Sequence, residues 1–144
     1  MNDRDYQEKL AAEGDLWGRV AEEQAGQVPP DWRYHRALRH NVVVHAGDID
    51  ALLARITPGM TALELGCASG WLTLAMAQRG AAAHGMDISD RAIAVGRAYY
   101  ESIRDAVPGA VTYSVADLNA LDLPAVTYDV IVAKGVLHHL VRLE

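Results

Sequence analysis

Hydrophobic and polar positions follow two different patterns along the chain. From residue 61 onward, short apolar runs alternate with longer amphipathic runs, whereas residues 1–30 are rich in Glu and Gln and contain few β-branched residues. Short apolar runs bounded by turn residues predict buried strands, and amphipathic runs predict helices. Their alternation therefore predicts strand–helix–strand units, which form a parallel sheet covered by helices.

Four apolar runs predict the strands of this sheet. They are TALEL at 61–65, AAAHGMD at 81–87, AVTYSVAD at 110–117 and YDVIVAK at 128–134. Between them, residues 70–80 predict a helix that Gly80 ends, and residues 89–107 predict a helix that follows the N-cap Ser89. The last ten residues, GVLHHLVRLE at 135–144, predict the start of a further helix.

The N-terminal part predicts helices without strands. Residues 6–26 predict one or two short helices, because glycines interrupt the run. Residues 31–46 predict a helical or mixed segment. Residues 47–59 predict a cleaner helix, with Asp48 as its N-cap and an apolar stripe on one face.

Composition narrows the class of protein. The chain has 144 residues, 51% of them hydrophobic, which suffices for a buried core. It carries 13 Lys and Arg against 19 Asp and Glu, a net charge of -6 that argues against a dedicated nucleic-acid binder. No apolar run approaches the length of a membrane span, and the N-terminus has no apolar signal-peptide region. With a single cysteine there is no internal disulfide, so we expect a cytoplasmic globular protein.

The candidate binding residues follow the predicted strands. In parallel sheets, ligands bind beyond the carboxyl ends of the strands, where this chain places Glu64, Asp87, Asp117 and Lys134. The turn GCASG at 66–70 has small side chains where the first strand passes into a helix. A ligand can therefore approach the backbone and the free N–H groups of that helix.

These residues favour a particular kind of ligand. A carboxylate at Glu64 would repel a pyrophosphate, and Trp71 stands where the dinucleotide fingerprint needs a small residue. Asp87 is placed to accept the two hydroxyls of a ribose, and Asp117 could accept from an exocyclic amine. A ligand with a ribose, an amine-bearing base and a cationic tail suits all three acids.

Four motifs in order carry a family resemblance: LELGCASG at 63–70, HGMDIS at 84–89, VADLN at 115–119 and YDVIVAKGVLHHL at 128–140. In their order and spacing they resemble the motifs of the class I S-adenosylmethionine-dependent methyltransferases, over roughly residues 45–140. The resemblance implies an α/β Rossmann-like doubly wound parallel sheet with N-terminal helices and binding of S-adenosyl-L-methionine. It divides the chain into an N-terminal helical extension or lid, residues 1–45, and a cofactor-binding domain, residues 46–144.

The resemblance also implies roles for individual residues. The loop residues would frame the methionine part, Glu64 would orient the loop from beneath, and Asp87 would hold the ribose. Ile88 would lie against the adenine face, and Asp117 and Leu118 would hold the adenine edge. Ala133 and Lys134, at the end of the fourth predicted strand, would lie near the methionine end. The expected cofactor-binding residues are Glu64, Gly66, Cys67, Ala68, Gly70, Asp87, Ile88, Asp117, Leu118, Ala133 and Lys134.

Structural roles stay open for several of these residues. Glu64 could be a buried acid with a structural hydrogen bond, Asp87 and Asp117 could be caps or turn residues, and Cys67 could be a plain loop residue. Trp17 could belong to a lid or pack against the sheet. We expect no metal site. His35, His40 and His45 lie five apart and so share no helix face, and the adjacent His138 and His139 would point about 100° apart on a helix.

The chain departs from the family pattern in two places. Ala68 replaces the usual second glycine of the loop, which is a mild change. The family fold has seven strands, whereas this sequence predicts an incomplete sheet of about four. The fourth strand would then be an apolar open edge. The chain could be a fragment of a longer protein, or it could pair that edge with a second copy or with a different subunit.

The expected function is methyl transfer from S-adenosylmethionine to a small-molecule acceptor, by in-line displacement. Catalysis would come mostly from positioning in a dry pocket, with His138 or His139 as candidate base. Two alternatives are open. One is a non-catalytic half-domain that binds the cofactor or a partner chain. The other is a nicotinamide-dependent oxidoreductase, against which Glu64 and Trp71 both argue.

Overall fold

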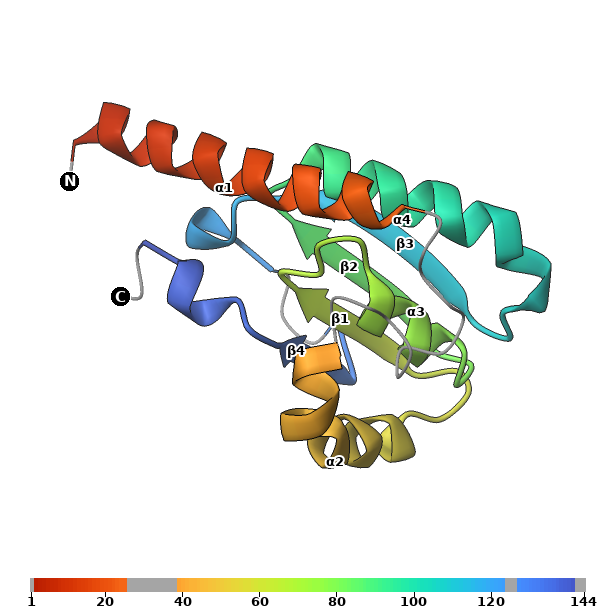
Figure 1. Cartoon of the computed structure of the whole chain (residues 1–144). Coiled ribbons are helices and arrows are strands. Elements are labelled where there is room, and N and C mark those ends of the chain that lie inside the picture. The colour runs from red at the N-terminus through yellow and green to blue at the C-terminus, as the bar shows by residue number, and fades with distance from the viewer. Residues whose placement is uncertain (1, 26–38, 124–126, 142–144) are drawn as a thin grey trace.

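The structure is a computed structural model that describes residues 2–25, 39–123 and 127–141, with the backbone alone for residues 39–46 (Figure 1). The helices are α1 (Asp3–Gln24), α2 (Arg39–Arg55), α3 (Trp71–Ala77) and α4 (Asp90–Ile103). The strands are β1 (Thr61–Leu65), β2 (Ala82–Asp87), β3 (Ala110–Val115) and β4 (Val130–Ala133). Short 3-10 turns are η3 (Arg104–Ala106), η4 (Leu118–Ala120) and η5 (Leu137–His139).

The strands form one parallel sheet in the order β3-β2-β1-β4. On one side of β1, Thr61 pairs with Ala82, and on the other side Ala62 pairs with Val130. The chain first adds strands in one direction and then returns to the opposite side of β1. The predicted Rossmann-like, incomplete sheet is therefore confirmed, and the point where its winding reverses lies between β1 and β4.

The core lies on one face of the sheet. Ala62, Ala83 and Val111 occupy paired register positions, so their side chains share this face. They are buried together with apolar side chains from three helices, because the amphipathic helices have no other apolar surface to cover. The helical members of this cluster are Ile49, Leu53 and Ile56 from α2, Leu72, Leu74, Ala75, Met76 and Ala77 from α3, and Tyr100 from α4.

The other face of the sheet is more polar, and at the side of β4 the sheet has an open edge. On this face His84 makes two hydrogen bonds: one of its ring nitrogens lies 2.8 Å from the Ser114 hydroxyl, and the other lies 2.9 Å from the Tyr128 hydroxyl. On β4, Ile131 is 55% exposed. The expectation of an apolar edge at the fourth strand is thus confirmed for the described residues.

Local sequence fixes two helix ends as predicted. The Ser89 side chain accepts a hydrogen bond from the Ala92 N–H and so caps α4. After α3, Gly80 has φ +90° and donates to the Ala77 carbonyl, while Ala81 donates to the Met76 carbonyl. This pair of bonds is a Schellman motif, and glycine adopts its left-handed position without a side-chain clash.

The helices differ from the expectations in three places. Of the one or two short helices expected over residues 6–26, a single helix forms, and it is longer than expected, since α1 runs unbroken from Asp3 to Gln24. Asp48 is not an N-cap, because α2 already begins at Arg39, and this helix crosses the boundary placed between residues 45 and 46. Beyond residue 135 only the single turn η5 forms before Leu140 becomes extended. The first part of segment 31–46 lies outside the described residues.

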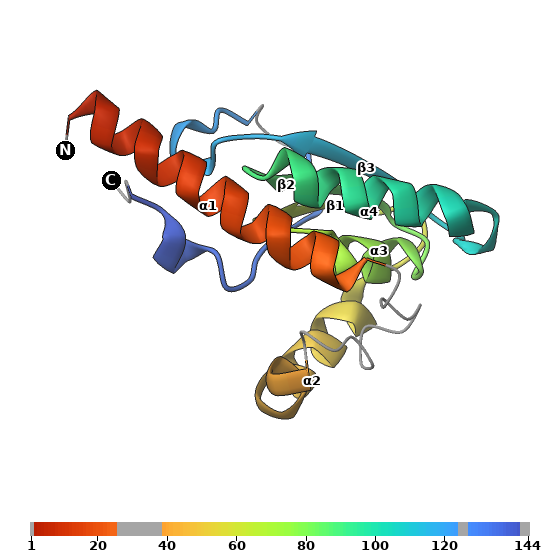
Figure 2. The same cartoon turned by 45° about the horizontal axis from the view of Figure 1, so that its top comes forward.

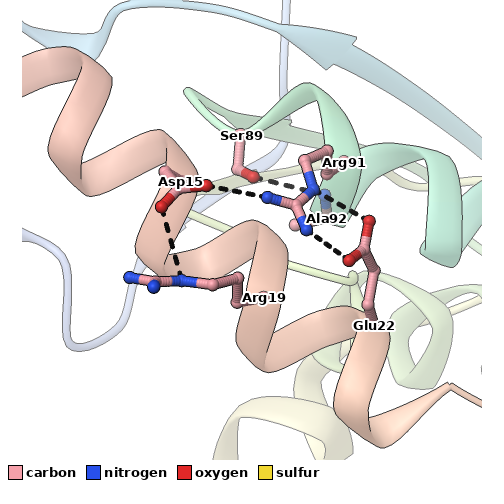
Figure 3. A network of polar contacts seen from close by, with 6 residues as sticks. All are labelled: Asp15, Arg19, Glu22, Ser89, Arg91 and Ala92. Carbon is pink, nitrogen blue, oxygen red and sulfur yellow. Dashed lines mark hydrogen bonds and ion pairs between the residues drawn. The ribbon is translucent and has the colours of Figure 1, made fainter.

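The N-terminal helix packs beside α4, as both views show (Figures 1 and 2). Arg91 at the start of α4 holds two carboxylates of α1, with 2.8 Å from its Nη1 to Asp15 and a two-point contact with Glu22 (Figure 3). Gly18 permits this approach, because a Cβ there would lie 2.9 Å from the Arg91 Cβ and 3.1 Å from the Ser89 hydroxyl. Within the described residues, no helix is long and apolar enough to cross a membrane.

Candidate functional site

A cavity of about 250 Å³ opens at the carboxyl ends of the strands. The loops after all four strands and one face of α1 surround it. Its lining residues are Leu10, Glu13, Trp17, Val20, Ala21, Gln24, Glu64, Gly66, Cys67, Ala68, Ser69, Trp71, Asp87, Ile88, Asp117, Leu118, Asn119, Lys134, Gly135, Val136, His139 and Leu140. Nine of the eleven expected cofactor-binding residues are among them, and Gly70 and Ala133 are not.

The loop after β1 has an unusual backbone. Gly66, Ala68 and Gly70 have φ values of +71°, +48° and +76°. The loop is held to β2 because the N–H groups of Gly66 and Cys67 both donate to the Met86 carbonyl, at 2.8 and 3.0 Å. Ala68 takes the left-handed conformation in spite of its methyl group, which costs on the order of 1 kcal/mol. The loop therefore keeps a left-handed backbone at this position although alanine replaces glycine.

Two glycines of the loop are needed for packing inside the protein. A Cβ on Gly66 would lie 2.3 Å from Cγ2 of Val136, in the segment after β4. A Cβ on Gly70 would lie 2.3 Å from the ring of Tyr113 on β3. Gly70 therefore makes room for Tyr113, which gives a reason for this glycine other than contact with a ligand.

Glu64 lies beneath the loop at the end of β1 and is 3% exposed. Its Oε2 accepts from the Thr73 N–H at 2.7 Å and from the Thr73 hydroxyl at 2.5 Å, both in the first turn of α3. Burial raises the pKa of Glu64 to about 8, although the Thr73 hydrogen bonds act in the opposite direction. A positive charge in the cavity would favour the ionised form of this carboxyl group.

Asp87 ends β2 and joins the two loops that border the cavity. Its Oδ2 accepts from the Ala68 N–H at 2.7 Å, and its Oδ1 accepts from the Ser89 N–H at 2.9 Å. Burial raises the pKa of Asp87, while these backbone hydrogen bonds lower it. The structure therefore gives Asp87 a structural role as well as a place in the cavity wall.

Asp117 lies two residues beyond β3 and is contacted from α1. The Tyr6 hydroxyl donates to its Oδ2, and the Asn119 N–H and side-chain amide both donate to its Oδ1 at 2.9 Å. Asp117 is also the N-cap of η4. Tyr6, which the sequence interpretation did not single out, thus fixes a carboxylate at the far side of the cavity.

The remaining candidates lie at the end of β4 and in the segment after it, and only some of them line the cavity. Lys134 lines the cavity and places its Nζ 5.6 Å from the centre of the Trp71 ring, whereas Ala133 is exposed on β4. His139 lines the cavity, but His138 is exposed and lies outside the lining. The two imidazole rings nevertheless lie against each other, with centroids 4.0 Å apart.

The sequence interpretation left open that Trp17 belongs to a lid, but it named no other residue of α1 as part of the site. The lining positions Leu10, Glu13, Trp17, Val20, Ala21 and Gln24 recur at spacings of three and four and so share one helix face. This pattern was visible in the sequence, although nothing local shows which surface the face covers. Within the described residues, no group of His, Cys, Asp or Glu side chains could hold a metal ion.

A parallel α/β sheet with acidic residues at its carboxyl ends, around a cavity, is the architecture of a Rossmann-like nucleotide-binding protein. The profile of the family described as "Methyltransferase domain" matches residues 62–144. The chain belongs to this family, and with it to the class I S-adenosylmethionine-dependent methyltransferases.

Individual proteins agree with this assignment. The ubiquinone biosynthesis O-methyltransferase of Paramagnetospirillum magneticum is 32% identical over 102 residues, which cover 71% of this chain and 39% of that protein. A methyltransferase structure from Mesorhizobium loti matches with a TM-score of 0.51 at 28% identity, over 62% of this chain and 38% of that one.

A third likeness concerns the fold alone. The magnesium protoporphyrin IX methyltransferase of Synechocystis, solved with bound SAH, matches with a TM-score of 0.65 at 20% identity. The match covers 90% of this chain and 60% of that one. The chain therefore spans about two fifths of the length of the curated relative it matches, and a larger share of this structure.

Proposed function

We propose that this chain binds S-adenosylmethionine and transfers its methyl group to a small-molecule acceptor. The observation that carries the proposal is the convergence of Glu64, Asp87 and Asp117 on one cavity. These acids come from three different strand ends, and their spacing suits a ligand with a cationic tail, a ribose and an amine-bearing base. The family assignment and the relatives named above support the same activity.

The residues present fit this cofactor. The pKa of Glu64, about 8, is near neutral pH, so this carboxyl group can ionise beneath a positively charged tail. The small side chain at Ala68 leaves room for the methionine part. Asp87 keeps the loop in place and is available to ribose hydroxyls, while Ile88 and Leu118 supply apolar surface for the adenine ring. Of the expected residues, we assign no direct contact to Gly70 and Ala133.

The chain itself would contribute orientation and a proton acceptor. When bound, S-adenosylmethionine supplies an electrophilic methyl group on a sulfonium. Residues from α1 form one wall of the cavity, which would shield the reacting groups from water and favour direct attack by the acceptor. Of the two candidate histidines we propose His139 as the base, because it lines the cavity and His138 does not.

Calorimetric titration with S-adenosylhomocysteine, with NAD as control, tests the cofactor half of this proposal. We expect micromolar binding of the former alone. Incubation with labelled S-adenosylmethionine and a panel of hydroxyl, amine and carbon acceptors then tests transfer. Cofactor binding without transfer to any acceptor would favour the half-domain alternative, and preference for NAD would favour an oxidoreductase.

We further propose that the edge at β4 pairs with a second copy of the chain or with a partner subunit, and that the protein acts in the cytoplasm. The exposed side chains of Ile131 on β4 and Leu137 on η5, 55% and 53% accessible, support the interface. Light scattering across a range of protein concentrations would test it. A monomer at every concentration would contradict pairing between copies.

A further inference from the structure

Three side chains from two distant parts of the sequence meet at the α1 side of the cavity: Glu13 and Trp17 from α1, and His139. His139 Nδ1 lies 3.2 Å and 3.3 Å from the two carboxylate oxygens of Glu13, which is 126 residues earlier in the chain. The Trp17 indole N–H donates to the same carboxylate at 3.2 Å. The Trp17 and His139 rings also meet edge to face, with centroids 5.6 Å apart and planes at 86°.

This arrangement selects one form of the imidazole. A carboxylate only accepts hydrogen bonds, so the proton of a neutral His139 ring belongs on Nδ1, facing Glu13. The lone pair is then on Nε2, the nitrogen that can receive a proton. The Trp17 N–H holds Glu13 from one turn further along α1, so the carboxylate is itself oriented.

The contact adds little to the stability of the fold. The side chains of His139 and Glu13 are 27% and 33% exposed, and ion pairs in such surroundings contribute weakly because water screens them. Their position in the cavity wall points instead to a role at the site. Because Glu13 belongs to α1, the histidine is oriented only while α1 is docked.

We propose that Glu13 is a positioning residue which holds His139 as a base with its Nε2 free, and that the acceptor is an uncharged hydroxyl compound; this rests on the methyltransferase function proposed above. The acceptor O–H gives its proton to Nε2, its oxygen bonds to the methyl carbon, and the sulfur–carbon bond breaks with its electron pair left on sulfur. An acceptor whose nucleophile is already an anion would not need this base.

The charges around the cavity agree with that choice of acceptor. Among the residues that the structure describes, the lining includes the acids Glu13, Glu64, Asp87 and Asp117 and one lysine, Lys134. Within the described part of the chain, the charged or titratable side chains in contact with His139 are Glu13 on α1 and the neighbouring His138. A carboxylate or phosphate on the acceptor would be repelled, whereas a neutral hydroxyl would enter without that cost.

The first test needs no activity. In ¹⁵N spectra of histidine-labelled protein, neutral His139 is expected as the Nδ1–H form, and Glu13→Gln should reduce that form. Glu8→Gln, a matched change on an exposed part of α1 where Glu8 pairs with Arg4, should leave the spectrum as it is. A wild-type ring protonated mainly on Nε2 would overturn the proposal even if the protein binds S-adenosylhomocysteine well.

The second test uses a series of substituted phenols of graded acidity as acceptors. Glu13→Gln should lower kcat about 10-fold or more for weakly acidic phenols, with KM changed less than about threefold; carboxylates that orient metal-ligating histidines through the second ring nitrogen have effects of this size. The loss should shrink for phenols already ionised at the assay pH. An equal loss across the series would mean a structural role only, and transfer to amines but to no hydroxyl compound would overturn the acceptor class.

Affinity for S-adenosylhomocysteine distinguishes a failure of the proposed methyltransferase function from a failure of the proposed role of Glu13. The Glu13→Gln variant should bind it within about twofold of wild type, because the assigned cofactor contacts do not include Glu13. A wild-type protein that fails to bind it at all would overturn the proposed function itself. Normal binding together with an unchanged kcat in Glu13→Gln would overturn the role of Glu13 alone.

Discussion

The hydroxyl of Tyr6 lies 2.5 Å from Oδ2 of Asp117, although the two residues are 111 positions apart in sequence. Tyr6 is 5% exposed, so the bond closes one end of α1 over the loop after β3. Together with Glu13–His139 and the Arg91 network, it is among the contacts that hold α1 against the rest of the described chain.

Tyr6→Phe should loosen the first half of α1. The aromatic ring stays in place while Asp117 loses one donor, so we expect a stability loss of about 1 kcal/mol. Amide hydrogen exchange within residues 3–13 should become faster. Tyr128→Phe, which removes the bond to His84 on the other face of the sheet, is the control and should leave α1 unchanged. Unaltered exchange in Tyr6→Phe would show that this bond does not hold the helix.

Glu64 should make stability depend on pH. Its pKa is about 8 in the folded protein against an ordinary value of 4.5, so folding favours the protonated group. The stability from this group is fully present below about pH 4.5 and is lost as pH rises through 8. Glu64→Gln should therefore flatten the decline in unfolding free energy between these pH values. Exposed Glu101→Gln serves as control, and equal slopes in wild type and Glu64→Gln would contradict the expected shift.

Cofactor binding should release a proton from the same group. S-adenosylhomocysteine has no charge on sulfur, but its α-ammonium group is positive. That group near Glu64 would favour the ionised carboxyl group, so affinity for S-adenosylhomocysteine should rise between pH 6 and 8. Calorimetry in buffers of different ionisation enthalpy measures the proton count directly. Near pH 7 the wild type should release close to one proton, and Glu64→Gln markedly less. Identical proton release in both proteins would assign it to another group.

Asp87→Asn should weaken cofactor binding by about tenfold or more, the range for loss of a hydrogen bond to a charged group. The amide retains one acceptor oxygen, so it cannot keep both the Ala68 and Ser89 N–H groups as Asp87 does. Asp90→Asn, an exposed neighbouring acid in the first turn of α4, should bind normally. Equal affinity of Asp87→Asn and wild type would exclude Asp87 from the site.

Gly66→Ala should destabilise the fold more than Gly59→Ala. Both glycines have positive φ, +71° and +87°, so both variants suffer backbone strain on the order of 1 kcal/mol. The methyl group at Gly59 meets open space, whereas at Gly66 it would overlap Val136. Urea unfolding of both proteins measures the difference. Equal midpoints would show that the segment after β4 moves aside without cost.

The sequence by itself determined the strands, the helix ends at Ser89 and Gly80, and the acids at the strand ends. These features depend on neighbours within a few residues: an apolar run followed by small residues, Ser89 before an amphipathic helix, and Gly80 after one. Because parallel strands all end at the same edge of a sheet, their order along the chain already placed Glu64, Asp87 and Asp117 together. The family motifs lie on these same elements.

Only the tertiary structure decided which surface α1 covers and which histidine faces the cavity. Tyr6, Glu13 and Trp17 lie on a helix far in sequence from the loops they contact, and periodicity shows an amphipathic face without naming its partner. Likewise, His138 and His139 are adjacent in the sequence, and a single 3-10 turn exposes one and directs the other inward. Such choices depend on packing between distant segments, which the pattern of neighbouring residues does not encode.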